Sequence, residues 1–188
     1  MTIQAIVKGW TGELKTKFSQ TLFLDLKEYH SFNNVLIKTG SGTTQIDHII
    51  VSKYGVFVVE TKNRNGWIYG KSNEPQWTEV LYKKKFKFQN PLRQNYLHTK
   101  SLAELLRINH NLIFSVIVFW GNCQFKTIMP ENVLLNTYTP YVKSKKLLLL
   151  HDKEIERICQ ELNQIKANTS FLDGWRHTKM LKKRFEGS

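Results

Sequence analysis

Cysteine, proline and acidic residues are all scarce in this chain. Of its 188 residues, 2 are cysteines, Cys123 and Cys159, and 4 are prolines. These two cysteines form neither a disulfide framework nor the paired spacing of a zinc site, so we expect ordinary thiols that are buried or half-buried. None of the prolines lies inside a strongly periodic segment.

Long hydrophobic runs are also missing. A membrane span needs roughly 18–20 apolar residues, and the longest candidates, residues 112–120 and 147–150, are far shorter. The first residues do not show the basic-then-apolar pattern of a secretory signal. The apolar content of 41% is nevertheless typical of globular proteins. We therefore expect a soluble, cytoplasmic protein with a single domain over residues 1–188, because this length is marginal for two domains.

The charge balance is strongly positive. Lys and Arg number 28 against 15 Asp and Glu, which gives a formal net charge of +13. Such an excess favours a polyanionic partner, nucleic acid before an anionic membrane surface. A charge that serves only solubility is the alternative, although a magnitude of roughly 2–8 is enough for a small domain.

Hydrophobic spacing predicts alternating helices and strands. We expect helices over residues 11–27, 91–107 and 153–166. We expect strands over residues 34–38, 43–51, 55–62, 67–69, 114–119 and 133–137, and a β-ribbon over 79–88. This order predicts the α/β fold class, with a mixed central sheet flanked by helices.

The second and third strands are joined by only four residues, 52–55, which favours an antiparallel hairpin. A register with Val51 opposite Val56 places further residues opposite one another on the same face. These pairs are Ile49 with Val58, Asp47 with Glu60, and Gln45 with Lys62. The face therefore changes from apolar near the turn to acidic and basic at the open end.

Two carboxylates on opposed strands are costly to place. Directly opposed Cβ atoms lie about 4.5–5.5 Å apart, so Asp47 and Glu60 repel and one of them raises its pKa. A divalent cation between them removes this penalty, and Lys62 can reach the same space to stabilise charge on a phosphate. The set suits metal-dependent hydrolysis of a phosphodiester. The alternative is a solvated patch in which Lys62 neutralises one acid, and a register slip of one residue would separate the set.

Several separated motifs are similar to one known family. They are GE at 12–13, GTTQIDH at 42–48, GVFVVETKN at 55–63, GWIYG at 66–70, Trp77, and NPLRQN at 90–95 with His98. In this order, over roughly residues 6–107, the chain resembles the NERD (nuclease-related) domain of the PD-(D/E)XK superfamily. Ile46 stands where the superfamily's name has proline.

The resemblance implies a restriction-endonuclease-like fold with an α-β-β-β-α-β core over about residues 6–120, and a C-terminal strand and helix extension over 121–188. It implies that Asp47 and Glu60 bind Mg²⁺ or Mn²⁺, that Glu13 completes the metal site, and that Lys62 is the catalytic lysine. Gln45 and Gln94 would line the site. From its position alone, without the resemblance, Glu13 is interpreted as an acid in the first turn of a helix, where the helix dipole favours it. The expected activity is a nuclease, on DNA rather than RNA; the alternatives are a non-catalytic nucleic-acid-binding module and a protein-interaction or membrane-surface domain.

A basic and aromatic segment extends the predicted contact with nucleic acid. Lys83, Lys84, Lys85 and Lys87 alternate with bulky residues and can hold phosphates, or they are lysines of an exposed ribbon. Trp67 can stack on a base, although tryptophan more commonly packs in a core. His98 follows Gln94 by one helical turn and could flank the site, whereas we expect His48 to be packed or hydrogen-bonded on the opposite face from Asp47.

Overall fold

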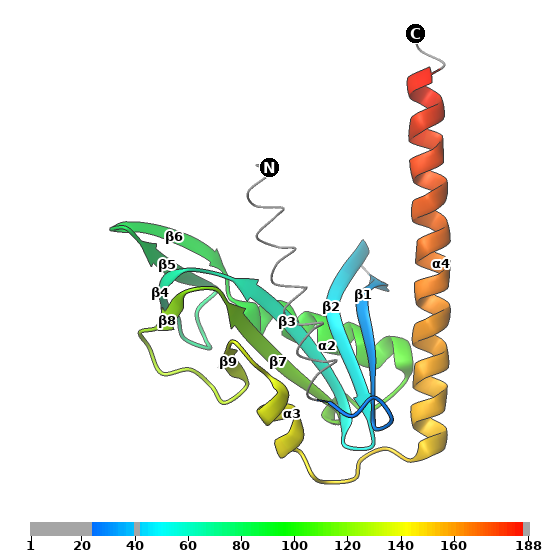
Figure 1. Ribbon diagram of the computed structural model, residues 1–188, viewed down its shortest axis with the longest axis horizontal. Coiled ribbons are helices and arrows are strands. Elements are labelled where there is room, and N and C mark those ends of the chain that lie inside the picture. Colours follow the sequence, from blue (N-terminus) through cyan, green and yellow to red (C-terminus); the bar gives the residue numbers. More distant parts are fainter. Residues whose placement is uncertain (1–23, 40–41, 186–188) are drawn as a thin grey trace.

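The computed structural model describes residues 24–39 and 42–185, and these form a mixed α/β fold with two mixed sheets (Figure 1). The first sheet has the strand order β1-β2-β3-β7-β9. Its strands are β1 (Tyr29–Thr39), β2 (Gly42–Ser52), β3 (Gly55–Asn63), β7 (Ile113–Trp120) and β9 (Val133–Leu135). The strands β1, β2 and β3 are antiparallel neighbours, whereas β7 lies parallel to β3 and to β9.

A second sheet has the strand order β6-β5-β4-β8. Its strands are β4 (Gly66–Tyr69), β5 (Gln76–Leu81), β6 (Lys84–Gln89) and β8 (Cys123–Phe125). The predicted ribbon is confirmed as the β5–β6 hairpin, whose turn residues Tyr82 and Lys83 both have positive φ. The expectation of one central sheet was incomplete, because the ribbon continues through β4 and β8 into a sheet of its own.

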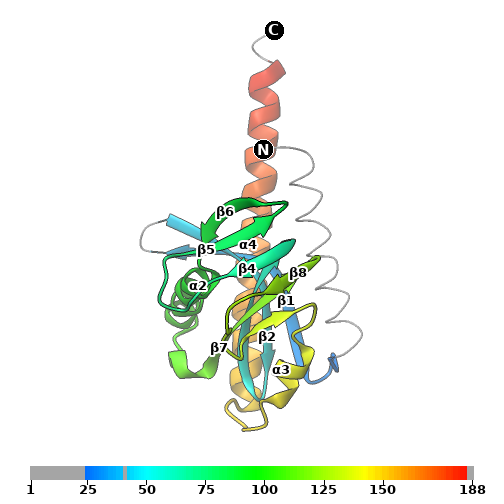
Figure 2. The same cartoon turned by 90° about the vertical axis from the view of Figure 1, so that its left-hand side faces the viewer.

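Helices cover both faces of the first sheet. They are α2 (Pro91–Leu106), α3 (Thr139–Ser144) and α4 (Asp152–Phe185), with a short 3-10 turn, η1 (His110–Leu112), between α2 and β7. One core cluster joins β2 and β3 to α2 and α4 through residues such as Val58, Leu102 and Ile158. A second cluster on the opposite face includes Phe57 and Val142 of α3. The long α4 runs along β1 and projects past the sheet (Figures 1 and 2).

A third cluster joins the two sheets. Ile68, Trp77 and Phe88 of the second sheet pack with Ile117 and Phe119 of β7. In the first sheet, Glu60 pairs with Ile117 and Lys62 pairs with Phe119. Paired residues in a ladder share a face of the sheet, so the second sheet lies on the same side of the first sheet as the Glu60 and Lys62 side chains.

Several boundaries differ from the sequence predictions. The strand expected over 34–38 spans Tyr29–Thr39, and the helix expected over 153–166 spans Asp152–Phe185. Of the helix expected over 11–27, residues 11–23 lie outside the described residues, and the remainder is a bend and turn in which Asp25 Oδ1 accepts from Lys27 N at 2.9 Å. Such a local side-chain bond competes with helix formation. Strand β8 and helix α3 were not predicted. Cys123 and Cys159 are free thiols, as expected.

Asn90 determines where α2 begins and how it joins the second sheet. Its Oδ1 accepts from Leu92 N at 2.9 Å, and its Nδ2 donates to Glu74 O at 2.7 Å and lies 3.2 Å from the carbonyls of Lys71 and Ser72. The side chain is fully buried. It therefore caps the helix and also satisfies carbonyls of the loop before β5.

Replacing Asn90 with alanine should lower the free energy of unfolding by about 2–4 kcal/mol, because the cap is lost and the carbonyls of Ser72 and Glu74 lose a buried side-chain donor. Urea denaturation followed by circular dichroism measures this. Asn109→Ala is the control, because Asn109 makes a similar cap to Asn111 N at 2.9 Å on the exposed η1 turn and should cost about 1 kcal/mol or less. Equal losses in the two variants would contradict the role given to Asn90.

Candidate active site

The hairpin register predicted near the β2–β3 turn is confirmed. Val51 pairs with Val56 and Ile49 pairs with Val58, and the ladder continues to His48 opposite Val59. The next expected pairs, Asp47 with Glu60 and Gln45 with Lys62, are absent from it. Beyond His48 the strands separate, while β3 remains paired with β7 as far as Asn63.

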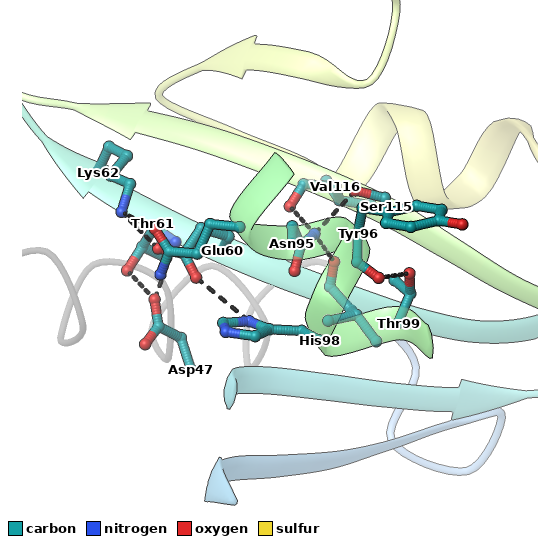
Figure 3. A network of polar contacts seen from close by, with 12 residues as sticks. Asp47, Glu60, Thr61, Lys62, Asn95, Tyr96, His98, Thr99, Ser115 and Val116 are labelled. Carbon is teal, nitrogen blue, oxygen red and sulfur yellow. Dashed lines mark hydrogen bonds and ion pairs between the residues drawn. The ribbon is translucent and has the colours of Figure 1, made fainter. Parts of the chain in front are cut away.

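The Asp47 carboxylate spans the start of this gap. Its Oδ2 accepts from the backbone N–H and from the side-chain Oγ1 of Thr61, both at 2.9 Å (Figure 3). Thr61 N would otherwise lose its partner where β2 leaves β3, and an unpaired backbone donor is costly. Asp47 therefore acts as a side-chain replacement for a ladder bond, and this orients its carboxylate. Sequence reasoning did not identify Thr61.

A break in strand alternation accompanies the separation. The β1–β2 register passes from the pair Asn33–His48 to the pair Val35–Ile46 and omits Asn34 and Asp47. Asn34 has a φ of 54°, a left-handed conformation that asparagine tolerates. Strict alternation places residues three apart on opposite faces. Yet the pairs Phe32–Ile49 and Val35–Ile46, three residues apart on each strand, pack in the same core cluster. The sheet is thus distorted where Asp47 sits.

Glu60, Lys62 and Gln94 form a connected polar group. Lys62 Nζ donates to Glu60 Oε1 at 2.6 Å and to Gln94 Oε1 at 2.9 Å. The side chains of Glu60 and Lys62 are only 4% and 17% exposed. Lys62 therefore pairs with Glu60 inside the protein, where solvent screens the interaction little.

Helix α2 brings Gln94 and His98 to this group. Asn95, between them, has its Nδ2 2.9 Å from both Val58 O and Ser115 Oγ, which ties the helix to β3 and β7 (Figure 3). Residues four apart lie on the same face of a helix, so Gln94 and His98 both point to the acids. His98 Nδ1 lies 3.6 Å from Glu60 Oε2. The interpretation that His98 could flank the site is therefore confirmed.

Burial and charge shift the pKa of two groups. Burial, with the nearby Asp47 carboxylate, raises the pKa of Glu60 to about 7, against the opposing effect of Lys62. Burial lowers the pKa of His98 against the opposing effect of the Asp47 carboxylate, and Lys62 adds to the lowering. A separation of 3.6 Å is too long for a hydrogen bond, and the buried Nδ1 of His98 has no hydrogen-bond partner among the described residues. The repulsion between the Asp47 and Glu60 carboxylates is therefore only partly offset by Lys62. The Nδ1 atom of His98 lies beside Glu60.

The family comparison agrees with these motifs. A model of the nuclease-related domain (NERD) matches residues 8–120, which is more than half of the chain. The chain belongs to the nuclease-related domain family. An uncharacterized protein of Bacillus anthracis is 42% identical over 125 residues, a match that covers 65% of this chain and 58% of that protein. The chain thus spans less than two thirds of the length of this curated relative. No solved structure matches it.

The donor set of this NERD domain is compatible with a divalent cation. Within the described ranges no cluster of three or more His, Cys, Asp or Glu side chains is placed to hold a metal. Mg²⁺ is commonly bound by one or two carboxylates together with water and substrate phosphate, and Asp47 and Glu60 supply two hard oxygen donors. Glu13, predicted as a further ligand, lies outside the described residues, and its role stays a prediction.

The other predicted site residues lie in three places. Gln45 is exposed and turned toward β1, with Nε2 3.5 Å from Asn34 Oδ1, so the described residues do not bring it to Lys62. His48 is buried and bonded through Nδ1 to Asn33 Oδ1 at 2.6 Å, as expected. Trp67 is 49% exposed on β4 and is not a core residue. The lysines of the ribbon are all exposed: Lys83 at the turn, and Lys84, Lys85 and Lys87 on β6.

No helix in the described part is long and apolar enough to cross a membrane.

Proposed function

We propose that this NERD domain is a metal-dependent nuclease that hydrolyses phosphodiester bonds of nucleic acid, with DNA as the preferred substrate. The observation that carries the proposal is the buried Glu60 carboxylate, held beside Asp47 and bonded to Lys62, where β2 and β3 separate. Strongly perturbed acids with specific charge partners are typical of catalytic sites.

Each described side chain has a distinct part in the proposal. Asp47 and Glu60 would hold Mg²⁺ or Mn²⁺, which when bound supplies Lewis-acid stabilisation of phosphate charge and a more acidic water. Thr61 orients Asp47 through its two hydrogen bonds. Lys62 places an ammonium next to Glu60, where it can hold the attacking water or stabilise charge on the phosphate.

The direct test is cleavage by the purified chain. Labelled single- and double-stranded DNA and RNA are incubated with the protein in EDTA, Mg²⁺ or Mn²⁺, beside Asp47→Asn. The proposal expects cleavage that needs the metal and is lost in Asp47→Asn. Absence of metal-dependent cleavage of every substrate would count against it.

A non-catalytic nucleic-acid-binding module is the second candidate. The contact between Lys62 and Glu60 favours it, because an ammonium within 2.6 Å neutralises the acid that a metal would need. This candidate expects nucleic-acid binding in EDTA that is unchanged by Asp47→Ala, together with no Mn²⁺ binding by calorimetry. Mn²⁺ binding that depends on Asp47 would exclude it.

Gln94 is a positioning residue in this proposal, because its Oε1 accepts from Lys62 Nζ at 2.9 Å and its side chain also hydrogen-bonds to Glu60. Gln94→Ala should lower kcat by about 10- to 100-fold, since a displacement near 1 Å can cost that much, and should leave the Mn²⁺ dissociation constant nearly unchanged. Gln94→Glu keeps an acceptor oxygen and should recover most of the activity. Gln89→Ala, at an exposed glutamine of β6, is the matched control. A change in metal affinity with no change in kcat would contradict this role.

A further inference from the structure

The two faces of the second sheet differ in character. On the inner face Ile68, Trp77 and Phe88 are buried against β7. On the other face Trp67 pairs with Val80, and Val80 pairs with Lys85. In the next row Tyr69 pairs with Thr78, and Thr78 pairs with Lys87. We call this second surface, made of these six residues, the outer face.

The outer face combines exposed aromatic rings with positive charge. Trp67 and Tyr69 are 49% and 36% exposed, although large aromatic rings on a sheet are usually covered. Lys126 Nζ lies 4.9 Å from the centre of the Trp67 ring. The outer-face residues line a groove of about 880 Å³, and none of these described residues is acidic.

We propose that the outer face binds single-stranded nucleic acid, with bases stacked on Trp67 and Tyr69 and phosphates paired with Lys85, Lys87 and Lys126. Aromatic rings bind bases of any sequence through their π-faces, and lysines beside them follow the backbone. The aromatic rings on β4 lie between positive charges on both sides. Lys85 and Lys87 are on β6, two strand spacings or about 9.5 Å away, and Lys126 follows β8 on the other side of β4.

The spacing of the rings favours an unpaired strand. Residues two apart on a strand are separated by about 6.5–7 Å, roughly twice the 3.4 Å step along one strand of a duplex. Neighbouring bases can therefore occupy both rings only when they are unstacked, and bases inside a duplex offer no free face. The outer face thus selects a single strand by geometry.

The surface adjoins the candidate active site along the chain. Trp67 follows Lys62 by five residues, so their Cα atoms are at most about 18 Å apart. The inference rests on the proposed function only for the use of the bound strand as a substrate, since the binding itself needs neither metal nor cleavage.

Binding is tested with the whole chain in EDTA, by fluorescence anisotropy of a labelled single-stranded oligothymidylate. Trp67→Ala should weaken binding by about 10- to 100-fold, the usual range for one lost stacking contact, and Trp67→Phe should restore most of it. Phe86→Ala is the matched control, because Phe86 is 47% exposed on β6 but pairs with buried Glu79, on the opposite face. It should change binding by no more than about twofold.

Salt dependence tests the phosphate contacts. The double change Lys85→Ala and Lys87→Ala should reduce the slope of log K against log salt by about 1.4, since each phosphate contact to a single strand contributes about 0.7. Lys143→Ala with Lys153→Ala, two exposed lysines on α3 and α4, should leave the slope unchanged. Urea midpoints equal to that of the parent chain confirm that the variants are folded.

The outcomes separate this inference from the proposed function. Equal affinity of Trp67→Ala and Phe86→Ala, tighter binding of a duplex than of the single strand, or binding of anionic lipid vesicles without oligonucleotide binding would each overturn the outer-face proposal. Tight, Trp67-dependent binding without any cleavage supports the outer face and counts against the nuclease. Cleavage of single strands that is unchanged by Trp67→Ala would support the nuclease and count against the outer-face proposal.

Discussion

Replacing Lys62 with alanine is expected to lower metal-dependent cleavage by about 10²- to 10³-fold, the usual cost of removing one donor that stabilises transition-state charge. The ammonium is held by Glu60 Oε1 at 2.6 Å and Gln94 Oε1 at 2.9 Å, so it is already placed beside the acids. The measurement is the single-turnover rate with saturating Mn²⁺, because product release then does not mask the chemical step.

Metal binding distinguishes a catalytic from a structural role for Lys62. Without the ammonium, Glu60 loses a competing cation, so Mn²⁺ binding by calorimetry should be kept or strengthened in Lys62→Ala. Lys53→Ala is the matched control, since Lys53 is also paired with a glutamate, Glu28, but at the closed end of the same hairpin. Loss of Mn²⁺ binding in Lys62→Ala, or equal activities of the two variants, would contradict the assignment.

Replacing Glu60 with glutamine is expected to stabilise the protein at pH 8 while removing its response to metal. The pKa of Glu60 is raised from 4.5 to about 7 in the folded chain, chiefly by burial and then by Asp47. A raised pKa means that the folded state holds this proton more tightly than the unfolded state. The contribution of Glu60 to stability is therefore greatest below about pH 4.5, falls as the pH rises through 7, and is lost above it.

The size of the effect follows from the shift. Each pKa unit corresponds to about 1.4 kcal/mol, so an ionised Glu60 costs about 3 kcal/mol at pH 8 as an upper limit. Glu60→Gln should remove most of this cost, with a gain of about 2–3 kcal/mol at pH 8 that shrinks as the pH falls and disappears below about pH 4.5. Urea denaturation at a series of pH values measures it.

Two comparisons test the interpretation of Glu60. Mn²⁺ should stabilise the parent chain more at pH 8 than at pH 6, because the proton competes for the carboxylate, and it should not stabilise Glu60→Gln. Glu79→Gln should instead lower the free energy of unfolding at pH 8. Buried Glu79 pairs with Arg64 at 3.1 Å and accepts from Asn65 N at 2.9 Å. A Glu60→Gln variant less stable than the parent at pH 8 would show that the acid is not under strain.

Local patterns predicted much of the candidate site. The short link at 52–55 and the alternation around Val51 and Val56 predicted the hairpin and its register as far as Ile49. The two-residue spacing of Glu60 and Lys62 predicted that they share a face, and they form an ion pair. The helix after Pro91 was predicted from its first-turn proline and apolar spacing. These features depend on neighbours within a few residues, which periodicity and turn chemistry report directly.

The environment of the site was not predictable in the same way. Regular strands would have placed Asp47 opposite Glu60, whereas the observed contact is with Thr61, because β2 leaves the ladder where Asn34 adopts a positive φ. The exposure of Trp67 and the burial of Trp77 depend on which face of the second sheet packs on β7. Nothing in either tryptophan's local sequence decides that choice.

The sequence by itself determined the basic charge, the order of most strands and helices, the turn end of the hairpin and the family motifs, because composition and short-range spacing are local properties. Only the tertiary structure decided which groups surround Glu60, how far its pKa is raised, and which aromatic rings remain in solvent. These depend on α2 and the second sheet closing over β3 and β7. The desolvation of Glu60 arises from the packing of segments that are distant in the sequence, so residue spacing does not predict it.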